Sequence, residues 1–331
     1  MAGQLDDSIS IFAPAASAGF GADVAAAVGL RLARHEELVF TGGEYKLRPI
    51  ESVRGRSVYV IQSLFGDKSG SSNDRLCSLL FFIGALKDSG ARRVTACVPF
   101  LAYARLDRRT AAHDPVTTRY VARLFEAAGA DRVLALEVHN RAAFDNAFRC
   151  ETVHLEAAPL FTRHFCAAAE GVEFAVATPD IGGAARARRV QELLQAALGR
   201  PVNFAIVDKK RSHGVVSGDL FAGEVEGRRV IIVDDLIDSG TTVLHAIDAC
   251  RRAGALRVDV AATHASFAPA AHRLFDSGKP DSVLVTDSVA LGDDFSAYLG
   301  GLLTVIKVAP TFAEAIRRLE HGGSLSELEG L

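Results

Sequence analysis

The segment Val230–Val243 reads VIIVDDLIDSGTTV and joins a run of aliphatic residues to two adjacent carboxylates and then to small hydroxylic residues and glycine. The aliphatic run predicts a buried strand, which we expect over residues 229–233. Acids directly after such a strand are expected at the carboxyl end of a sheet, where open α/β folds bind ligands. Asp234 and Asp235 are therefore candidate ligand-binding residues.

The small residues that follow are suited to contact an anion. Ser239, Gly240, Thr241 and Thr242 would let backbone N–H groups at the start of the next helix approach a phosphate. The segment lacks the GxxxxGK[ST] pattern of a nucleotide P-loop. Two acids are suited to bind sugar hydroxyls and a divalent metal next to a single terminal phosphate. A ribose 5-phosphate unit has hydroxyls and a phosphate in this arrangement. The alternative is a solvated turn that caps a helix.

Length and composition predict two ordinary α/β domains. The chain has 331 residues, of which 49% are hydrophobic and 23% are charged, so it can fill two cores. A net charge of −3 predicts no general attraction to nucleic acid or to an acidic membrane. The five scattered cysteines lack metal-site spacing, the first residues lack a basic leader region, and no apolar run is long enough to cross a bilayer. We therefore expect a cytoplasmic protein.

Short Val- and Ile-rich runs alternate with segments of helical periodicity, which predicts parallel sheets with crossover helices. The predicted strands are residues 58–62, 93–98, 132–136, 173–177, 203–207, 229–233, 257–262, 282–285 and 303–306, and the main predicted helices are 74–88, 117–128, 182–198 and 242–253. The segments that begin at Ala85 and Ala249 share a helix end, a glycine suited to a left-handed cap, and an Arg-Val pair that opens a strand. This repeat predicts two similar domains that meet near residue 155.

Several segments together resemble the ribose-phosphate diphosphokinase family, also called PRPP synthases after their product, 5-phosphoribosyl 1-diphosphate. VIIVDDLIDSGTTV resembles the PRPP-binding motif that this family shares with type I phosphoribosyltransferases. Four further segments are similar to family motifs in order and spacing: VPFLAYARLDRR (98–109), EVHN (137–140), TPDIGGAARAR (178–188) and VDKKR (207–211). ATHASF and the C-terminal segment are also similar, so the resemblance spans nearly the whole chain.

The resemblance implies a fold, a reaction and a set of site residues. The fold is α/β, with two type I phosphoribosyltransferase-like domains: residues 1–155 on the nucleotide side and residues 156–331 with the ribose 5-phosphate loop. The reaction transfers the β,γ-diphosphoryl group of MgATP to ribose 5-phosphate, and the family commonly forms homodimers or larger homo-oligomers. The implied residues are Lys209 and Arg211 for catalysis, Asp234, Asp235, Asp238, Ser239, Gly240, Thr241 and Thr242 for ribose 5-phosphate, Phe40, Glu44, Arg105, Asp107 and His139 for ATP, and His139 and Asp180 for Mg²⁺.

The individual residues could have purely structural roles, and the whole chain could have a different function. A histidine after a strand is usually structural, and a basic run such as Lys209–Arg211 is usually a solvated loop, although few apolar anchors follow it and a mobile lid is expected. The chain could be a non-catalytic regulatory paralogue, but such paralogues usually lose the lid cations or the acid pair. A simple phosphoribosyltransferase would leave Arg105, His139 and the lid without a role.

The chain departs from the family pattern in the base-binding region. Gly42 stands where relatives have Asp or Asn, and Leu106 replaces the Gln of YARQDR. Both changes remove hydrogen-bonding groups, which predicts altered selection of the nucleotide donor. The segment 63–74 is longer than its family equivalent, and 110–115 lacks a basic, serine-containing regulatory segment, so we expect no conventional allosteric control.

Overall fold

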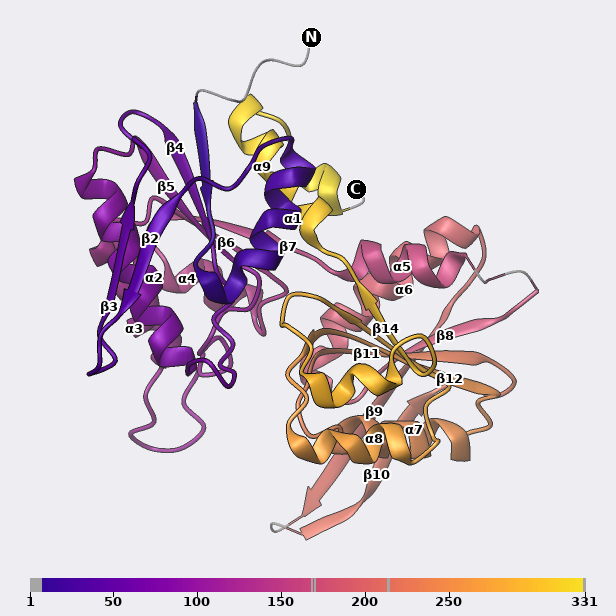
Figure 1. Ribbon diagram of the computed structural model, residues 1–331. Helices are drawn as coiled ribbons and strands as arrows, with labels where there is room; N and C mark the ends of the chain where they lie inside the picture. Colours follow the sequence, from indigo (N-terminus) through magenta and orange to yellow (C-terminus); the bar gives the residue numbers. More distant parts are fainter. Residues whose placement is uncertain (1–7, 168, 170, 213–214, 330–331) are drawn as a thin grey trace. The chain divides into compact units, whose positions relative to one another are not determined.

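The computed structural model describes residues 8–167, 169, 171–212 and 215–329, without the side chains of 208–220 (Figure 1). The chain forms two compact α/β units. The first contains the residues up to Leu155 together with Val308–Leu328, and the second contains Glu156–Lys307. Among the described residues, no helix is both long and apolar enough to cross a membrane.

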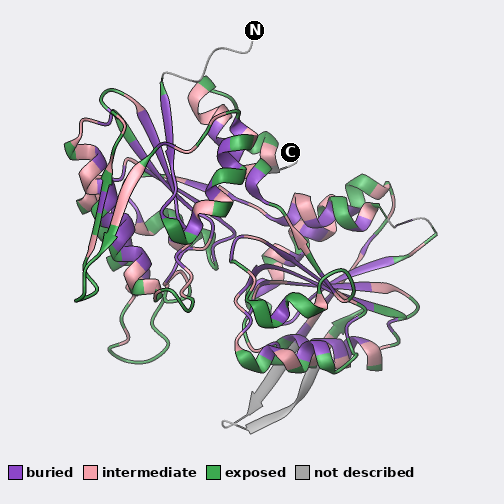
Figure 2. Ribbon diagram, in the orientation of Figure 1, coloured by how far each residue is buried: buried purple, intermediate pink, exposed green. Residues whose placement is uncertain are grey.

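The first unit has a parallel sheet in the order β1-β4-β5-β6-β7 and a separate antiparallel hairpin. Its strands are Ile9–Phe12 (β1), His35–Val39 (β2), Tyr45–Pro49 (β3), Ser57–Ile61 (β4), Arg93–Val98 (β5), Arg132–Leu136 (β6) and Glu151–Leu155 (β7). Its helices are Ala18–Val28 (α1), Ser72–Asp88 (α2), Thr117–Ala128 (α3), Arg141–Ala147 (α4) and Ala309–His321 (α9), with a 3₁₀ turn at Ala15–Ser17 (η1). The interior strands β4 and β6 are buried along their length, as Figure 2 shows in purple.

The second unit has a mixed sheet in the order β10-β9-β8-β11-β12-β13-β14, in which only the β9–β10 pairing is antiparallel among the described strands. Its strands are Phe174–Thr178 (β8), Asn203–Ser212 (β9), Val215–Gly223 (β10), Arg229–Ile237 (β11), Arg257–Ala265 (β12), Ser282–Thr286 (β13) and Leu303–Ile306 (β14). Its helices are Ala158–Cys166 (α5), Ala184–Leu198 (α6), Thr241–Arg252 (α7) and His272–Asp276 (α8), with 3₁₀ turns at Ile181–Gly183 (η2), Pro269–Ala271 (η3) and Asp293–Tyr298 (η4). A further turn, Ser326–Glu329 (η5), follows α9.

Alternation along β11 separates two cores on opposite faces of this sheet. Val230 and Ile232 pack in the core that contains residues of α7. Ile231 and Val233 pack in the core that contains residues of α5 and α6. Helices therefore cover both faces, which confirms the predicted α/β class.

Most predicted elements are present. The repeated glycines Gly90 and Gly254 have φ values of +87° and +87°, as a left-handed cap requires. The sequence does not predict β1, β2, β3, β7 or β10. Of these, β2 and β3 are rich in charged residues and lie outside the main sheet, so the apolar pattern of a buried strand is missing.

The C-terminal helix differs from the predicted domain boundaries. The sequence assigns residues 156–331 to the second domain, but α9 belongs to the first unit. Phe312 lies edge-on to Phe20 of α1, with ring centroids 5.5 Å apart, and Arg317 donates a hydrogen bond to the carbonyl of Ala27. The apolar face of α9 is thus buried against α1, a contact between residues far apart in the sequence.

Candidate active site

The carboxyl ends of β8 and β11 lie where the strand order of the second unit reverses. The chain passes from β8 to β9 on one side, whereas β11 pairs with β8 on the other. The segments after these two strands lead into α6 and α7, which pack on opposite faces of the sheet. In open α/β sheets, such a reversal is where ligands bind.

The acid pair belongs to β11 itself. The sequence predicts that the strand ends at residue 233, but β11 continues to Ile237, because Asp234, Leu236 and Ile237 still pair with β12. The Asp235 N–H donates to Asp234 Oδ1 at 2.8 Å. Asp235 is only 8% exposed, so these carboxylates are held by a strand rather than by a solvated turn.

Burial and mutual repulsion make this pair electrostatically unusual. Burial, followed by the negative charge of Asp235, raises the pKa of Asp234 well above its usual value, and Arg186 acts in the opposite direction. Arg186 Nη2 lies 3.8 Å from Asp235 Oδ2. Arg186 lies in the segment TPDIGGAARAR, but the sequence predicts no role for it. It lies in the first turn of α6, where a cation is disfavoured, but the sequence predicts that this helix begins two residues earlier, at residue 182.

The loop after β11 leads directly into the amino end of α7. Gly240 has φ +72°, and a Cβ there would lie 3.0 Å from Leu274 Cβ, so glycine meets both the backbone and the space requirement. Ser239 Oγ accepts a hydrogen bond from the Thr241 N–H at 3.4 Å. Thr241 and Thr242 are exposed. Exposed N–H groups at a helix start are suited to hold a phosphate.

Residues after β12 brace this loop. Phe267 N–H donates to the carbonyl of Ile237 at 3.0 Å, and Ala268 N–H donates to the carbonyl of Asp238 at 3.0 Å. Ser266 Oγ also donates to the Ile237 carbonyl at 3.1 Å. The ATHASF segment, to which the sequence gave no role, thus fixes the backbone that carries Asp238.

Asp180 caps the turn that follows β8. Its Oδ1 accepts the Gly183 N–H at 2.9 Å, and Thr178 Oγ1 donates to the Asp180 carbonyl at 2.7 Å. A Cβ on Gly183 would lie 2.6 Å from Thr178 Oγ1, so the turn requires glycine. Asp180 is exposed, which leaves its carboxylate accessible from solvent.

Lys209 and Arg211 lie on a β-hairpin. The sequence predicts a strand over 203–207 and then a mobile lid, whereas β9 extends to Ser212 and pairs with β10. Lys209 is opposite Asp219, and Arg211 is opposite Val216 in the backbone register. Their side chains lie outside the described residues.

In the first unit, two of the predicted ATP-binding segments meet. Asn140 Nδ2, next to His139, donates to Asp107 Oδ2 at 2.7 Å, which joins the segments that follow β5 and β6. Two non-glycine residues in these segments have left-handed backbones, Tyr103 at φ +66° and Glu137 at φ +42°. Strained backbone of this kind is concentrated at functional sites.

The remaining residues predicted for the nucleotide and the metal are also exposed. Arg105 and His139 lie on the same two segments. Phe40, which is 51% exposed, and Glu44 form the turn of the separate β2–β3 hairpin, where the Phe40 N–H donates to the Glu44 carbonyl at 2.9 Å. His139 belongs to the first unit and Asp180 to the second. Within the described part of the chain, no three His, Cys, Asp or Glu side chains form a ready-made metal site.

Comparisons with known proteins identify the family. A model of the N-terminal domain of ribose phosphate pyrophosphokinase matches residues 9–129, and a model of the phosphoribosyl synthetase-associated domain matches residues 205–329. The ribose-phosphate pyrophosphokinase of Caldanaerobacter subterraneus is 36% identical over 97% of this chain and 98% of its own. The chain belongs to the ribose-phosphate pyrophosphokinase family. The pyrophosphokinase of Maricaulis maris is 37% identical over 87% of this chain and 89% of its own.

A solved structure supports the same family assignment. The phosphoribosylpyrophosphate synthetase of Mycobacterium smegmatis has a TM-score of 0.84 and 30% identity to this pyrophosphokinase family member, covering 96% of this chain and 100% of that one. The family and the fold inferred from sequence motifs are therefore confirmed. The individual site residues remain predictions.

Proposed function

We propose that this chain is a catalytic ribose-phosphate pyrophosphokinase that makes PRPP and AMP from ribose 5-phosphate and MgATP. The anomeric oxygen of ribose 5-phosphate forms a bond to the β-phosphorus, the bond from that phosphorus to the α,β-bridging oxygen breaks, and the hydroxyl proton is lost. The observation that carries this proposal is the acid pair of β11, which leads into the amino end of α7 at the strand reversal. Similarity to named enzymes over nearly the whole chain supports it.

The ribose 5-phosphate site would combine two kinds of group. Asp234, Asp235 and Asp238 would accept hydrogen bonds from sugar hydroxyls, and the segment from Ser239 to Thr242 would surround the 5-phosphate. The 3.0 Å bonds that brace the backbone at Ile237 and Asp238 support this role, because they fix the loop before the ligand arrives. Little ordering would then be needed on binding.

Mg²⁺ would be held by Asp180 and His139 together with the phosphates of ATP. The exposed, backbone-anchored carboxylate of Asp180 fits a hard cation that prefers oxygen ligands and retains waters. The bound ion would neutralise charge on the transferring phosphates. Phe40, Glu44, Arg105 and Asp107 would bind the nucleotide, and Lys209 and Arg211 would stabilise the charge of the transition state.

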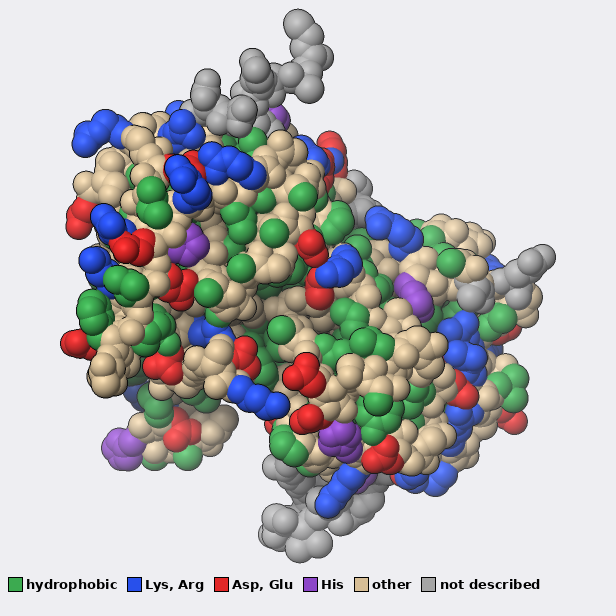
Figure 3. Space-filling view, viewed as in Figure 1, with side chains coloured by type: hydrophobic (Ala, Val, Ile, Leu, Met, Phe, Trp, Pro, Cys, Tyr) green, Lys and Arg blue, Asp and Glu red, His purple; other side chains and the backbone are tan. Residues whose placement is uncertain are grey.

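The protein would act in the cytoplasm as a homodimer or larger homo-oligomer. Exposed apolar side chains on α2 and α3 support self-association: Phe81 is 62%, Tyr120 is 51% and Leu124 is 48% exposed. On the face viewed in Figure 3, Lys and Arg side chains are interspersed with Asp and Glu. This mixture fits small-molecule substrates rather than a nucleic acid partner.

Phosphorus NMR of the purified chain with ATP, Mg²⁺ and ribose 5-phosphate tests the activity. We expect PRPP and AMP to appear in equal amounts, and neither to form when Mg²⁺ is chelated. A chain that binds both substrates but forms no PRPP would be the non-catalytic paralogue. Release of ADP instead of AMP would contradict transfer of a diphosphoryl group.

A further inference from the structure

Arg186 lies beside the acid pair, although no sequence motif gave it a function. It is the third residue of α6, and its Nη2 lies 3.8 Å from Asp235 Oδ2. Only 11% of the Arg186 side chain and 12% of the Asp235 side chain are exposed. The pairing follows from the sheet, because Asp235 comes two residues after Val233, whose side chain packs with residues of α6.

Helix stability does not explain a cation at this position. The amino end of a helix carries partial positive charge, so an arginine in the first turn is disfavoured. Two other arginines of α6 have separate structural contacts. Arg188 stacks on Phe204 at 4.3 Å from the ring centroid, and Arg189 Nε lies 3.0 Å from Glu156 Oε2. Arg186 instead extends toward β11.

The acid pair needs such a partner. Two adjacent carboxylates that are largely shielded from water repel each other, and burial adds a desolvation penalty. A guanidinium beside Asp235 offsets both effects. At 3.8 Å this contact between Arg186 Nη2 and Asp235 Oδ2 is an ion pair rather than a hydrogen bond.

We propose that Arg186 is a positioning residue of the ribose 5-phosphate site, which holds the Asp235 carboxylate where it accepts hydrogen bonds from the ribose hydroxyls. This inference rests on the proposed function. Arg186 acts through Asp235 and makes no contact with the sugar. Its loss therefore weakens ribose 5-phosphate binding even when no nucleotide is present.

Calorimetric titration of ribose 5-phosphate into the full chain without nucleotide tests this role. Arg186→Met keeps the length and the helix propensity but removes the charge, and we expect it to raise the Kd about tenfold or more. Arg186→Lys keeps the charge without the planar guanidinium, and we expect a rise of about two- to fivefold. Arg188→Met on the same helix is the matched control and should bind as the wild type does.

A double variant separates positioning from direct contact. If Arg186 acts through Asp235, Arg186→Met combined with Asp235→Asn binds no more weakly than Asp235→Asn alone. Additive losses would show that Arg186 contacts the substrate itself and would overturn the inference. Melting temperatures of all variants confirm folding, and the Lys variant carries the test if the Met variant unfolds.

The outcome is distinguishable from failure of the proposed function. A wild-type chain that forms PRPP, with an Arg186→Met variant whose Kd is unchanged, overturns the positioning role and leaves the function intact. A wild-type chain that neither binds ribose 5-phosphate nor forms PRPP overturns both.

Discussion

Asp234 illustrates how a residue that we propose to bind a substrate can oppose the stability of the fold. Its pKa is raised by burial and then by the charge of Asp235, so the folded state binds its proton more tightly than the unfolded state does. Stability contributed by this group is therefore lost as the pH rises above the ordinary range for aspartate.

Asp234→Asn should therefore separate function from stability. We expect ribose 5-phosphate affinity to fall at least about tenfold, because a hydrogen bond to a charged group contributes roughly 1.5–3 kcal/mol. We expect the melting temperature at pH 7 to stay the same or rise. Asp235→Ala should also lose affinity, and a double variant with near-normal turnover would contradict the site. Calorimetry and thermal unfolding give the two measurements.

Gly42 and Leu106, which differ from the family pattern in the predicted base-binding region, lead to a second prediction for single residues. A Cβ added at Gly42 would have no other atom within 4 Å, and the backbone there does not have a positive φ, so a side chain can be added. The adjacent Gly43, in contrast, has φ +84°. Leu106 is 45% exposed. An apolar site discriminates by only about 1–3 kcal/mol, so we expect other nucleoside triphosphates to be used within about two orders of magnitude of ATP in kcat/KM.

Gly42→Asp combined with Leu106→Gln should sharpen the preference for ATP. Each change supplies a hydrogen-bonding group that only the correct base edge satisfies. Competition assays with GTP and CTP measure the effect, and Gly43→Asp is a control for strain in the turn. Exclusion of GTP by more than about 10⁴-fold in the unmodified protein would show that other groups already recognise the base.

At the scale of elements, the β9–β10 hairpin changes how the basic segment is understood. Lys209 and Arg211 belong to a paired strand, in which successive residues belong to opposite faces. Lys210 is thus a natural control within the same strand. Replacing Lys209 or Arg211 with Ala should reduce kcat much more than it raises KM, by roughly 3 kcal/mol or more of transition-state stabilisation. Steady-state kinetics that show only a raised KM would contradict the catalytic role.

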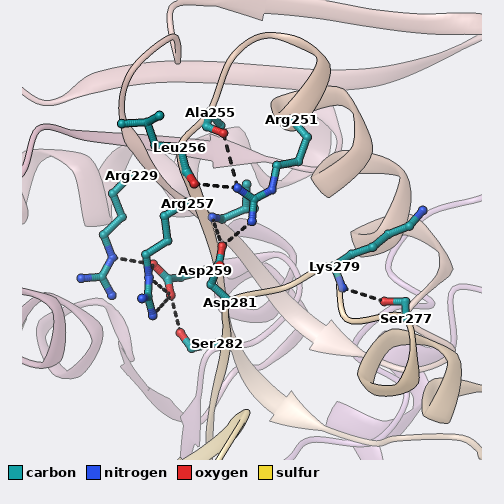
Figure 4. Close-up of polar contacts among 11 residues, drawn as sticks. Arg229, Arg251, Ala255, Leu256, Arg257, Asp259, Ser277, Lys279, Asp281 and Ser282 are labelled. Atoms are coloured by element: carbon teal, nitrogen blue, oxygen red, sulfur yellow. Dashed lines mark hydrogen bonds and ion pairs between the residues drawn. The ribbon is translucent and has the colours of Figure 1, made fainter.

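A buried ionic network joins the amino ends of three neighbouring strands (Figure 4). Asp259 of β12, whose side chain is 0% exposed, accepts hydrogen bonds from Arg229 of β11 at 2.5 Å and from Ser282 of β13 at 2.5 Å. Arg257 Nη2 lies 3.1 Å from the same carboxylate. Burial alone would raise the pKa of Asp259, but the bonds from Arg229, Arg257 and Ser282 outweigh it and keep that pKa low.

Asp259→Asn should lower the free energy of unfolding by about 3–5 kcal/mol, because it leaves the largely buried guanidinium of Arg229 without its counter-ion. Asp248→Asn is the control, since its pair with Lys279 is exposed and contributes below about 1 kcal/mol. A carboxylate with a lowered pKa stabilises the fold above its ordinary pKa and loses that contribution as the pH falls. In urea unfolding, the free energy of unfolding of Asp259→Asn should therefore lie below that of the wild type at pH 7, and this difference should shrink in acid. A difference that does not depend on pH would contradict the ionic cause.

At the scale of the whole molecule, the chain returns to its first unit at the C-terminus. Phe312 and Ile316 of α9 are fully buried. Tyr59 of β4, which is also fully buried, donates a hydrogen bond to Glu320 Oε1 at 2.7 Å. The core of the first unit therefore includes residues of α9 that lie more than 150 positions after Leu155, where the N-terminal part of this unit ends.

Phe312→Ala should destabilise the first unit by about 3–5 kcal/mol through the cavity that it leaves. Deletion of residues 309–331 should leave that unit unfolded. Deletion of 322–331 should preserve it, because the contacts of Arg318 with Glu327 and with the Ser324 carbonyl, which would be lost, lie at the partly exposed end of α9. Limited proteolysis and thermal unfolding report on both truncations. A stable first unit in the longer deletion would show that α9 is dispensable.

The sequence by itself determined the local features of this protein. The bounds of β5, β6, β14 and α3 match the predicted ranges, because strand and helix periodicities are short-range properties of the chain. The acid-pair motif, together with the four further segments that resemble family motifs, also gave the family, which the comparisons confirm. Both rest on residues that are close together in the sequence or on motifs in a fixed order.

Only the tertiary structure decided which distant residues meet. It extended β11 through the acid pair by pairing it with β12, formed the β9–β10 hairpin where a lid loop was predicted, and assigned α9 to the first unit. It also placed Arg186 beside Asp235, 49 positions later in the chain. Strand register and helix packing depend on contacts across the sheet, which periodicity along the chain does not contain.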